Sequence, residues 1–420
     1  MSDPSSFQPK SDLVRVLTER GYLHQCTNLA GLDERAAAGS ITAYVGYDMT
    51  AQSLHIGNLI TLMLLRRVQQ TGHTPIVLTG TATTKVGDPT FKDKQRPLLT
   101  DEQVAANKAA IRTVFEKVLR FDGPNAAVEV DNAEWLEPLG YLEFLRSYGT
   151  HFTINRMLSF ESVRLRLDRE QPLTFLEFNY MLMQAVDFLQ LHQKHGCALQ
   201  MGGSDQWGNI VNGVEITRRI AEAEVFGLTT PLLMSAAGEK MGKTVGGAVW
   251  LNAEQFSAYD FWQFWRNVDD ADVGKLLRLF TDLPLTEIAR LEALQGAEIN
   301  AAKKVLADEA TRLLHGEAAR AQAESAARGA FEEGRLSADL PSVSVETAAL
   351  EAGVMLAALV ADAGLAGSRS DARRLAQGGG LRVNDQPEPD ANRTLTVADL
   401  KDGVIKLAAG KKKIVLVRPV

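Results

Sequence analysis

Short apolar runs alternate with longer helical patterns over the first 235 residues of the chain. The runs are rich in β-branched and aromatic side chains, as is typical of buried strands, and they cover 41–47, 75–80, 127–130, 198–201 and 231–234. Helical patterns lie between them at about 55–70, 100–119 and 206–226. This order predicts an α/β fold with a doubly wound, parallel, Rossmann-like sheet, which binds ligands at the carboxyl ends of its strands.

The rest of the chain follows other patterns. Residues 259–333 are helical in pattern and rich in Ala, Leu, Glu and Arg, and 336–346 contains the proline and serines typical of a linker. The final segment combines a basic helix from Ser368 with short strands. We therefore expect a Rossmann-like catalytic domain at 1–250, an α-helical domain with its linker at 251–346, and a small α+β domain at 347–420.

Composition restricts the class of protein. The 420 residues are 45% hydrophobic and 23% charged, as is ordinary for a soluble protein. The polar Met1–Lys10 segment lacks the apolar region of a signal peptide, and no apolar run is long enough for a membrane helix. Cys26 and Cys197 predict neither a disulfide framework nor a zinc site. We therefore expect a cytoplasmic protein that binds no membrane and ligates no metal.

Charge is unevenly distributed along the chain. From Leu350 to the end there are 11 Lys and Arg against 8 Asp and Glu, a net charge of +3. The preceding residues carry 34 basic against 44 acidic side chains, a net charge of −10. An acidic body with a basic tail suggests that the tail meets a polyanion. The alternative is a small excess of solvated lysines without a partner.

A candidate phosphate site follows the first strand. After the polar turn Asp48–Ser53, His55 lies at the start of a helix, where backbone N–H groups and the helix dipole favour anions. Asn58 lies three residues further on, so both side chains project from one face and could donate to phosphate oxygens. The alternative is an ordinary helix start with two polar surface residues.

A second candidate phosphate site is the Gly-rich segment Gly238–Gly247, which carries Lys240 and Lys243. Ammonium groups on a mobile loop can close over a pyrophosphate. The spacing is not that of a P-loop. An exposed turn with solvated lysines is the alternative, and the earlier His55 segment is what favours a phosphate role.

A candidate pocket for a small substrate lies on the apolar helix Glu177–Phe188. Tyr180, Gln184 and Asp187 occupy positions i, i+4 and i+7 and therefore share one face. Polar groups on a buried helix need partners. They satisfy one another, or they line a pocket for a ligand with an amine and a hydroxyl.

Two further turns follow strands at the same predicted sheet edge. Gly202–Asn209 begins a helix, and its glycines allow a nucleotide to approach the backbone closely. Val86–Thr90 contributes the carboxylate of Asp88, although Gly-Asp-Pro is also ordinary turn chemistry.

Together these segments resemble a bacterial-type tyrosyl-tRNA synthetase, a class I aminoacyl-tRNA synthetase, over essentially the whole chain. His55–Asn58 is similar to the signature His-Ile-Gly-His, and Lys240–Thr244 to Lys-Met-Ser-Lys-Ser. More specific matches are Tyr44–Asp48, Gly87–Pro89, Tyr180–Asp187 and Gly202–Asn209, which favour tyrosine as the amino acid. Asn58 and Gly242 depart from the two signatures, and both departures are compatible with the tyrosine branch.

The resemblance implies a role for each matching residue. The tyrosine phenol would be bound by Tyr44 and Asp187, and its α-ammonium by Asp88, Tyr180 and Gln184. The adenylate would contact Asp48, Gly57, Asp205 and Gln206, with Gln206 also near the tyrosine carboxylate. The reacting phosphates of ATP would be stabilised by Thr50, His55 and Asn58, and the leaving pyrophosphate by Lys92, Arg96, Lys240, Lys243 and Thr244.

The implied reaction has two steps. The carboxylate of L-tyrosine attacks the α-phosphate of ATP to give tyrosyl-adenylate and pyrophosphate, with Mg²⁺ bound through the polyphosphate and no metal ligated by the protein. The tyrosyl group then passes to the 3′ terminal ribose of tRNA(Tyr). The alternatives are a synthetase-like RNA-binding regulator without activation activity, another nucleotidyl transferase, and a tryptophan-specific synthetase.

The basic tail resembles the S4 RNA-binding module. Its candidate contacts with RNA phosphates are Arg369, Arg373, Arg374, Lys411, Lys412 and Lys413, and structural positive charge is the alternative for any one of them. The resemblance also implies a homodimer, formed through about 144–166 with Phe152, Ile154 and Met157 at the interface.

Overall fold

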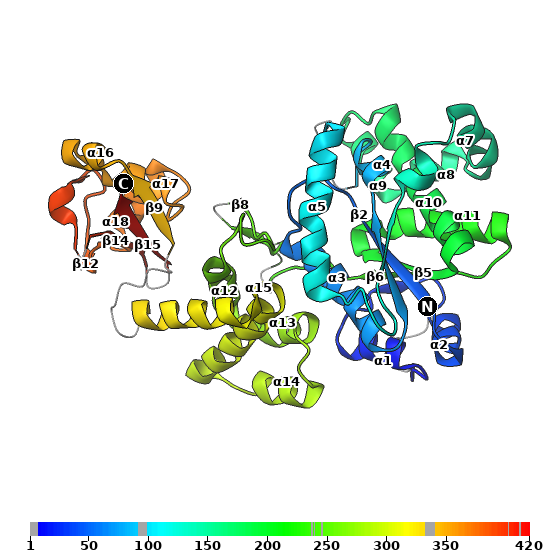
Figure 1. The fold of residues 1–420 in the computed structure, drawn as a ribbon, viewed down its shortest axis with the longest axis horizontal. Coiled ribbons are helices and arrows are strands. Elements are labelled where there is room, and N and C mark those ends of the chain that lie inside the picture. The colour runs from blue at the N-terminus through cyan, green and yellow to red at the C-terminus, as the bar shows by residue number, and fades with distance from the viewer. Residues whose placement is uncertain are drawn as a thin grey trace. The chain divides into compact units, whose positions relative to one another are not determined.

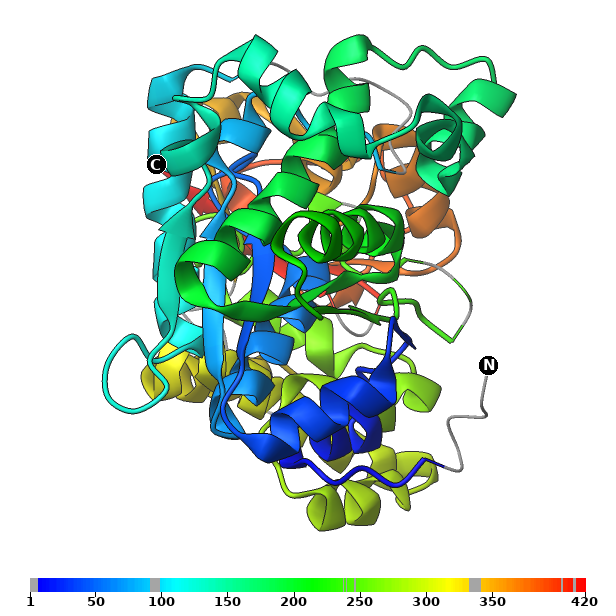
Figure 2. The ribbon, with the colours of Figure 1, turned by 90° about the vertical axis from the view of Figure 1, so that its right-hand side faces the viewer.

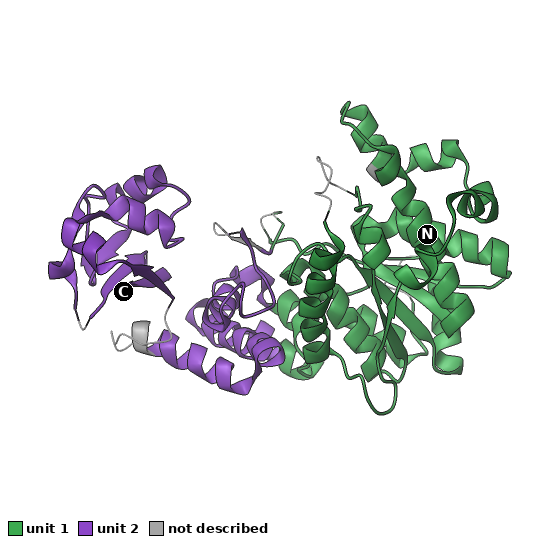
Figure 3. Ribbon diagram, turned by 45° about the horizontal axis from the view of Figure 1, so that its top comes forward, with its two compact units in different colours: residues 1–241, 274–289 green, residues 242–273, 290–420 purple. Residues whose placement is uncertain are grey.

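The computed structural model of the chain describes residues 7–90, 99–236, 238, 240–244, 247–331, 341–401, 403–410 and 413–420. Its residues form two compact units, shown in green and purple in Figure 3. The first comprises 1–241 with 274–289, and the second comprises 242–273 with 290–420. The division into three domains that the sequence predicts stays a prediction.

The first unit is built on a six-stranded sheet with the order β1-β6-β5-β2-β3-β4. Its strands are β1 (Gln25–Cys26), β2 (Thr42–Tyr47), β3 (Thr74–Thr79), β4 (Val128–Asp131), β5 (Cys197–Gly203) and β6 (Phe226–Thr230). Neighbouring strands are parallel except for β1, which pairs antiparallel with β6. The expected parallel α/β sheet is confirmed, with one short antiparallel strand at its edge.

Helices cover both faces of this sheet. They are α1 (Asp12–Glu19), α2 (Leu29–Ala38), α3 (Ile56–Gln70), α4 (Thr81–Thr84), α5 (Asp101–Val118), α10 (Phe175–His195) and α11 (Trp207–Ala221). Side chains alternate between faces along a strand, so Tyr44 and Tyr47 of β2 point to opposite sides. Tyr44 packs on Phe188 of α10 and Tyr47 on Phe115 of α5, with ring centroids 5.4 Å and 5.2 Å apart. Figure 2 shows α10 and α11, in green, in front of the strands.

Short helices connect β4 to α10 at the top right of the unit in Figure 1. They are α6 (Ala133–Leu136), α7 (Tyr141–Ser147), α8 (Ile154–Ser159) and α9 (Glu161–Asp168), with a 3-10 turn at Gly149–His151. Most of α13 (Val273–Phe280) and α14 (Leu285–Glu292) also belongs to the first unit.

The last strand of the sheet differs from the expected one. The sequence pattern predicts a strand at 231–234 and a helix reaching Phe226, whereas α11 ends at Ala221 and β6 covers Phe226–Thr230. Glu222 takes a left-handed conformation with a φ of 51°, which stops the helix early. Pro231 follows the last residue of β6, since proline has no N–H to donate to a strand ladder.

The helical part of the second unit pairs α12 (Ala258–Arg266) with α15 (Ile299–Phe331). A buried hydrogen bond from Trp262 Nε1 to Asp308 Oδ1, 2.8 Å long, joins the two helices. Gly316 interrupts α15 with a φ of 82°. A two-stranded hairpin of β7 (Lys243–Thr244) and β8 (Gly247–Ala248) precedes α12.

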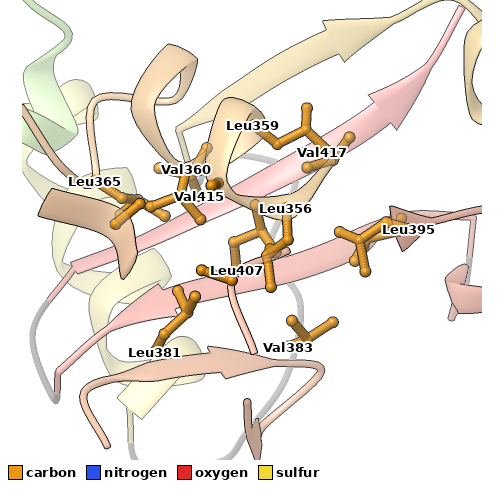
Figure 4. Close-up of a cluster of buried hydrophobic side chains, with 14 of the residues drawn as sticks. Leu356, Leu359, Val360, Leu365, Leu381, Val383, Leu395, Leu407, Val415 and Val417 are labelled. Atoms are coloured by element: carbon orange, nitrogen blue, oxygen red, sulfur yellow. The ribbon is translucent and has the colours of Figure 1, made fainter. Parts of the chain in front are cut away.

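The C-terminal part of the second unit is the small α+β fold that the sequence predicts. Its five-stranded sheet has the order β12-β11-β14-β15-β9, and β10 pairs with β13. The strands are β9 (Ser342–Val345), β10 (Val354–Met355), β11 (Leu381–Val383), β12 (Gln386–Pro387), β13 (Thr394–Leu395), β14 (Ile405–Ala409) and β15 (Lys413–Pro419). The helices are α16 (Thr347–Ala352), α17 (Leu356–Asp362) and α18 (Arg369–Gln377). A separate hydrophobic core, including Leu356, Leu381 and Leu407, holds them together (Figure 4).

Candidate active site

Tyr44 places an unpartnered hydroxyl inside the first unit. The residue is buried in the middle of β2 and is 1% exposed. Its Oη has no hydrogen-bond partner among the described residues. Burial, and secondarily the negative charge of Asp187, raises the pKa of Tyr44, so this hydroxyl stays protonated. A buried hydroxyl without a partner is costly, which points to a polar ligand group at this position.

The three polar residues of α10 do not satisfy one another. Tyr180 Oη donates to Asp48 Oδ2, 3.0 Å away, at the end of β2. Asp187 accepts bonds from residues that follow β4, and Gln184 Oε1 is buried without a partner among the described residues. No hydrogen bond joins any two of the three within the described part of the chain. Of the two interpretations that the sequence left open, the structure therefore favours a pocket.

Asp187 is a buried carboxylate in this group of residues. Its two oxygens accept from Trp135 Nε1 (2.8 Å) and Asn132 Nδ2 (3.1 Å). Burial raises the pKa of Asp187 to about 7, and these two hydrogen bonds oppose the increase, while the charges of Asp48 and Asp131 add to it. The carboxyl group can therefore change its charge near neutral pH.

Acidic groups gather around the hydroxyl of Tyr180. Burial, and then the charges of Asp48 and Asp88, raise the pKa of Tyr180 well above its ordinary value. Asp88 accepts from Gln206 Nε2 at 2.9 Å and from the backbone N–H of Thr90 at 3.0 Å. Asp88 is thus a turn residue and also part of the polar cluster. Two carboxylates beside one hydroxyl favour a cationic ligand group, such as an ammonium.

Thr83, Asn132 and Trp135 also belong to this cluster, although they were not predicted from the sequence. Thr83 Oγ1 donates to Asp48 Oδ1 (2.8 Å) and accepts from Asn132 Nδ2 (3.0 Å), which also reaches Asp187. The Asn132 amide and the Thr83 hydroxyl together therefore connect the carboxylates of Asp187 and Asp48. Asn132 comes directly after β4. Ligands bind at the carboxyl ends of parallel strands, so its position after a strand was the signal that could have identified it.

His55 and Asn58 form the N-terminal cap of α3. His55 Nδ1 accepts from the backbone N–H of Gly57 (3.0 Å), and Asn58 Oδ1 accepts from the backbone N–H of His55 (3.2 Å). Because Nδ1 is an acceptor, the neutral imidazole carries its proton on Nε2. The cap uses the oxygen of the Asn58 amide, so the NH₂ group of the same amide can still donate hydrogen bonds. The structure thus confirms the helix start predicted from the sequence, and the anion site stays a prediction.

Gly57 is required by the position of the His55 ring. A Cβ atom at residue 57 would lie 2.8 Å from His55 Cε1 and 3.0 Å from Nδ1. These distances are shorter than van der Waals contact, so any side chain here would displace the imidazole. The glycine of the early signature thus keeps the histidine over the first turn of α3.

Lys240 is an exposed residue at the base of a short hairpin. It pairs antiparallel with Met234, and the N–H of Met241 donates to the C=O of Leu233 at 2.9 Å. Lys243 and Thr244 form β7 in the second unit, and their side chains are outside the described part of the structure. Residues Lys92 and Arg96 are also outside it.

The remaining nucleotide candidates follow strands at one sheet edge. Thr50 lies in the loop after β2, and Asp205 and Gln206 lie in a 3-10 turn (Ser204–Gln206) after β5. Since β5 and β2 are parallel neighbours, these loops leave the sheet at the same edge as Asp48. This arrangement can hold a nucleotide against a small polar pocket.

The basic residues predicted for RNA binding lie partly on one helix. Arg369, Arg373 and Arg374 are exposed on α18, and Lys413 is exposed at the start of β15. Arg374 forms an ion pair with Asp371, and Arg373 Nε donates to Asn392 Oδ1 at 3.1 Å. Lys411 and Lys412 fall outside the described residues.

In the part of the chain that is described, no helix is both long and apolar enough to cross a membrane. The same residues contain no group of three or more His, Cys, Asp or Glu side chains that could hold a metal ion.

Comparison with known proteins gives matches along the whole chain. Residues 36–332 match the tRNA synthetases class I (W and Y), and residues 356–400 match the S4 domain. The chain is 67% identical to the tyrosine–tRNA ligase of Caulobacter vibrioides (strain NA1000 / CB15N), over 100% of both chains. It is 57% identical to the tyrosine–tRNA ligase of Rhodospirillum rubrum, over 98% of both.

A solved structure of similar fold is a C-terminally truncated mitochondrial tyrosyl-tRNA synthetase from Aspergillus nidulans. Its TM-score is 0.70 at 29% identity, covering 78% of this chain and 96% of that one.

Proposed function

We propose a residue-level mechanism for this chain, which belongs to the tyrosine–tRNA ligase family of class I tRNA synthetases. The enzyme uses ATP to activate L-tyrosine and transfers the tyrosyl group to tRNA(Tyr). The function that the sequence predicts is therefore confirmed, whereas the role of each residue is a proposal. A regulator without activation activity would be expected to lack pocket carboxylates or signature lysines, and Asp88, Asp187, Lys240 and Lys243 are all present.

The tyrosine side chain enters the pocket between β2 and α10. Its phenol O–H donates to the carboxylate of Asp187, and its oxygen accepts from Tyr44 Oη. The observation that carries this proposal is the unpartnered, buried hydroxyl of Tyr44 beside a buried carboxylate. Phenylalanine would leave the Tyr44 hydroxyl without an acceptor and would offer no O–H to Asp187, and tyrosyl-tRNA synthetases are themselves the standard example of discrimination by this effect.

The α-ammonium of tyrosine binds at the acidic end of the pocket. It donates to Asp88, Gln184 Oε1 and Tyr180 Oη. Gln184 Oε1 is buried without a partner, and Asp48 and Asp88 both act on Tyr180, so a cation here relieves an unfavourable arrangement. Gln206, already bonded to Asp88, lies beside the tyrosine carboxylate.

Adenylate formation is an in-line displacement at the α-phosphate. A carboxylate oxygen of tyrosine forms a bond to the α-phosphorus while the bond to the bridging oxygen breaks, and pyrophosphate leaves. His55 Nε2–H and the Asn58 amide donate to phosphate oxygens as their charge increases, with Thr50 beside them. No side chain acts as the nucleophile, so catalysis consists of positioning and electrostatic stabilisation.

Cations neutralise the leaving pyrophosphate. We assign this role to Lys92, Arg96, Lys240 and Lys243, and the hydroxyl of Thr244 donates a hydrogen bond to the same pyrophosphate. Asp48, Gly57 and Asp205 contact the adenosine portion of ATP. Mg²⁺ carried on the phosphate oxygens of ATP would neutralise further charge on the leaving group.

The second step uses tRNA. The terminal ribose hydroxyl attacks the tyrosyl carbonyl of the adenylate, and AMP leaves. We assign the exposed arginines of α18, with Lys411, Lys412 and Lys413, to contacts with tRNA phosphates in the S4 domain. The cytoplasmic location predicted from the sequence stays a prediction.

We also propose that the enzyme is a homodimer. Large apolar side chains are exposed at Leu142, Ile154 and Phe175, which are 74%, 61% and 66% exposed. Exposed apolar side chains concentrated in one segment mark an interaction surface. Met157 is only 4% exposed and packs inside its own subunit, so the interface uses Ile154 and its exposed neighbours. Light scattering on the full chain tests this, and a monomer mass would contradict it.

Asp187→Ala tests the tyrosine pocket. The variant should increase the KM for tyrosine by about a hundredfold in pyrophosphate exchange, because the phenol loses a charged partner. The KM for ATP should change by less than about threefold. Asp122→Ala, which removes an exposed carboxylate after α5, is the matched control. Equal losses for tyrosine and ATP would contradict the assignment of Asp187 to the phenol.

A further inference from the structure

Lys275 reaches the hairpin that carries Lys240. Its ammonium, in the first turn of α13, donates to the backbone C=O of Met234 at 2.7 Å. The two residues are 41 apart in sequence and both belong to the first unit. Lys275 is half-buried, and the mechanism above gives it no role.

The geometry of the hairpin explains why Met234 accepts this bond. Met234 and Lys240 form an antiparallel bridge, flanked by the bond from Met241 N–H to Leu233 C=O at 2.9 Å. A flanking bond of this kind makes Met234 and Lys240 a non-hydrogen-bonded pair, in which their own carbonyls point out of the hairpin. The C=O of Met234 thus needs a partner from outside, and Lys275 supplies it. The same pairing keeps residues 234 and 240 directly opposite each other.

The opposite end of α13 is fixed to the body of the first unit. Arg20 donates to the carbonyls of Arg278, Thr281 and Leu283 at 3.1, 3.0 and 2.7 Å. Arg67 of α3 donates to the C=O of Thr281 at 2.6 Å and pairs with Asp282 at 2.5 Å.

This fixed end makes α13 a rigid support for the hairpin. Arg67 is 1% exposed and belongs to the helix that begins at the His55 cap. The helix α3 therefore has the His55 cap at its start. Near its end, Arg67 binds the residues that follow α13, the helix that contacts the Lys240 hairpin.

We propose that Lys275 is a positioning residue for Lys240 in tyrosine activation. Its hydrogen bond fixes the C=O of Met234. Because Lys240 lies directly opposite Met234 in the hairpin, this bond also fixes the position of Lys240 relative to the leaving pyrophosphate. This inference rests on the role proposed above for Lys240. It assigns Lys275 no contact with substrate, so its loss acts on the rate of adenylate formation and leaves the tyrosine pocket intact.

The test is a double-mutant cycle in the full-length enzyme. Lys275→Met removes the ammonium and keeps most of the stem. Alone, it should lower kcat for tyrosine-dependent pyrophosphate exchange about tenfold, as loss of one charged hydrogen bond predicts, with the KM for tyrosine unchanged within about twofold. Lys275→Arg should restore most of the rate. In a Lys240→Ala background, Lys275→Met should cause no further loss.

Controls separate this inference from the proposed function. Lys10→Met, which removes an exposed lysine paired with Glu34, should leave the rate unchanged. A normal rate in Lys240→Ala would overturn the role of Lys240 itself. A slow Lys240→Ala enzyme combined with a normal Lys275→Met enzyme would overturn only the inference. Additive losses in the double variant, or a fall in melting temperature that accounts for the loss, would also overturn it.

Discussion

At the scale of single residues, burial decides the chemistry of the pocket. Asp187 is 2% exposed, yet Asn132 and Trp135 each donate one hydrogen bond to it, which keeps an ionised carboxylate possible near neutral pH. Tyr44 has the opposite arrangement, with a buried hydroxyl that has no hydrogen-bond partner among the described residues. In the proposed binding mode, the phenol donates a hydrogen bond to Asp187 and accepts one from Tyr44.

The pKa of Asp187, about 7, predicts a pH dependence for tyrosine binding. Below pH 7 the carboxyl group is increasingly protonated and becomes a weaker, uncharged acceptor for the phenol O–H. The affinity for tyrosine should therefore rise by up to about tenfold per pH unit as the pH increases toward 7, and level off above it. Equilibrium dialysis from pH 5.5 to 8.5 measures this dependence. Asp187→Asn should flatten the profile, and an unchanged profile in that variant would assign the titration to another group.

At the scale of elements, the start of α3 is a helix cap at which we propose that phosphate binds. The sequence pattern placed the helix start correctly, since His55 is the N-cap and α3 begins at Ile56. It did not show that Asn58 caps the backbone of His55, because a cap bond depends on side-chain rotamers. Asn58, which departs from the signature histidine, supplies a carbonyl oxygen for the cap, and we propose that its NH₂ group donates to the phosphate.

Gly57→Ala tests the link between the cap and catalysis. The new Cβ would lie 2.8 Å from His55 Cε1, so the ring must turn away from the cap. We expect kcat for tyrosine activation to fall about a hundredfold, as for loss of one transition-state donor, with little change in the KM for tyrosine. Gly39→Ala is the matched control, since a Cβ there meets nothing within 4 Å. A normal rate in Gly57→Ala would show that the ring position does not matter.

At the scale of the whole molecule, the parallel sheet could be predicted from the sequence, the candidate pocket stays a prediction, and the sequence failed where tertiary contacts decide. Apolar runs and helical spacing located β2 to β5 and the shared face of α10. The edge strand β1 is only two residues long and has no periodic signal. Thr83 and Asn132 were missed because hydrogen bonds between distant loops leave no mark in local sequence. The boundaries of the domains stay predictions.

Deletion of the chain after Glu346 tests the role of the C-terminal part. That part has its own hydrophobic core, so its removal should leave pyrophosphate exchange within about threefold of the full chain. Charging of tRNA should fall by at least about a hundredfold, because phosphate contacts supply much of the affinity for RNA. The full-length variant with Arg373→Gln and Arg374→Gln is the matched comparison and should show an intermediate loss. Unchanged charging by the truncated enzyme would remove the RNA role from this region.

The most direct test of the proposed site is a crystal structure of the full-length enzyme with L-tyrosine bound. We expect the phenol oxygen within hydrogen-bond distance of Tyr44 Oη and Asp187, and the ammonium in contact with Asp88, Tyr180 and Gln184. Both buried atoms that lack partners, Tyr44 Oη and Gln184 Oε1, should then be satisfied. A tyrosine bound with its ammonium at Asp187, or outside the space between β2 and α10, would contradict the account.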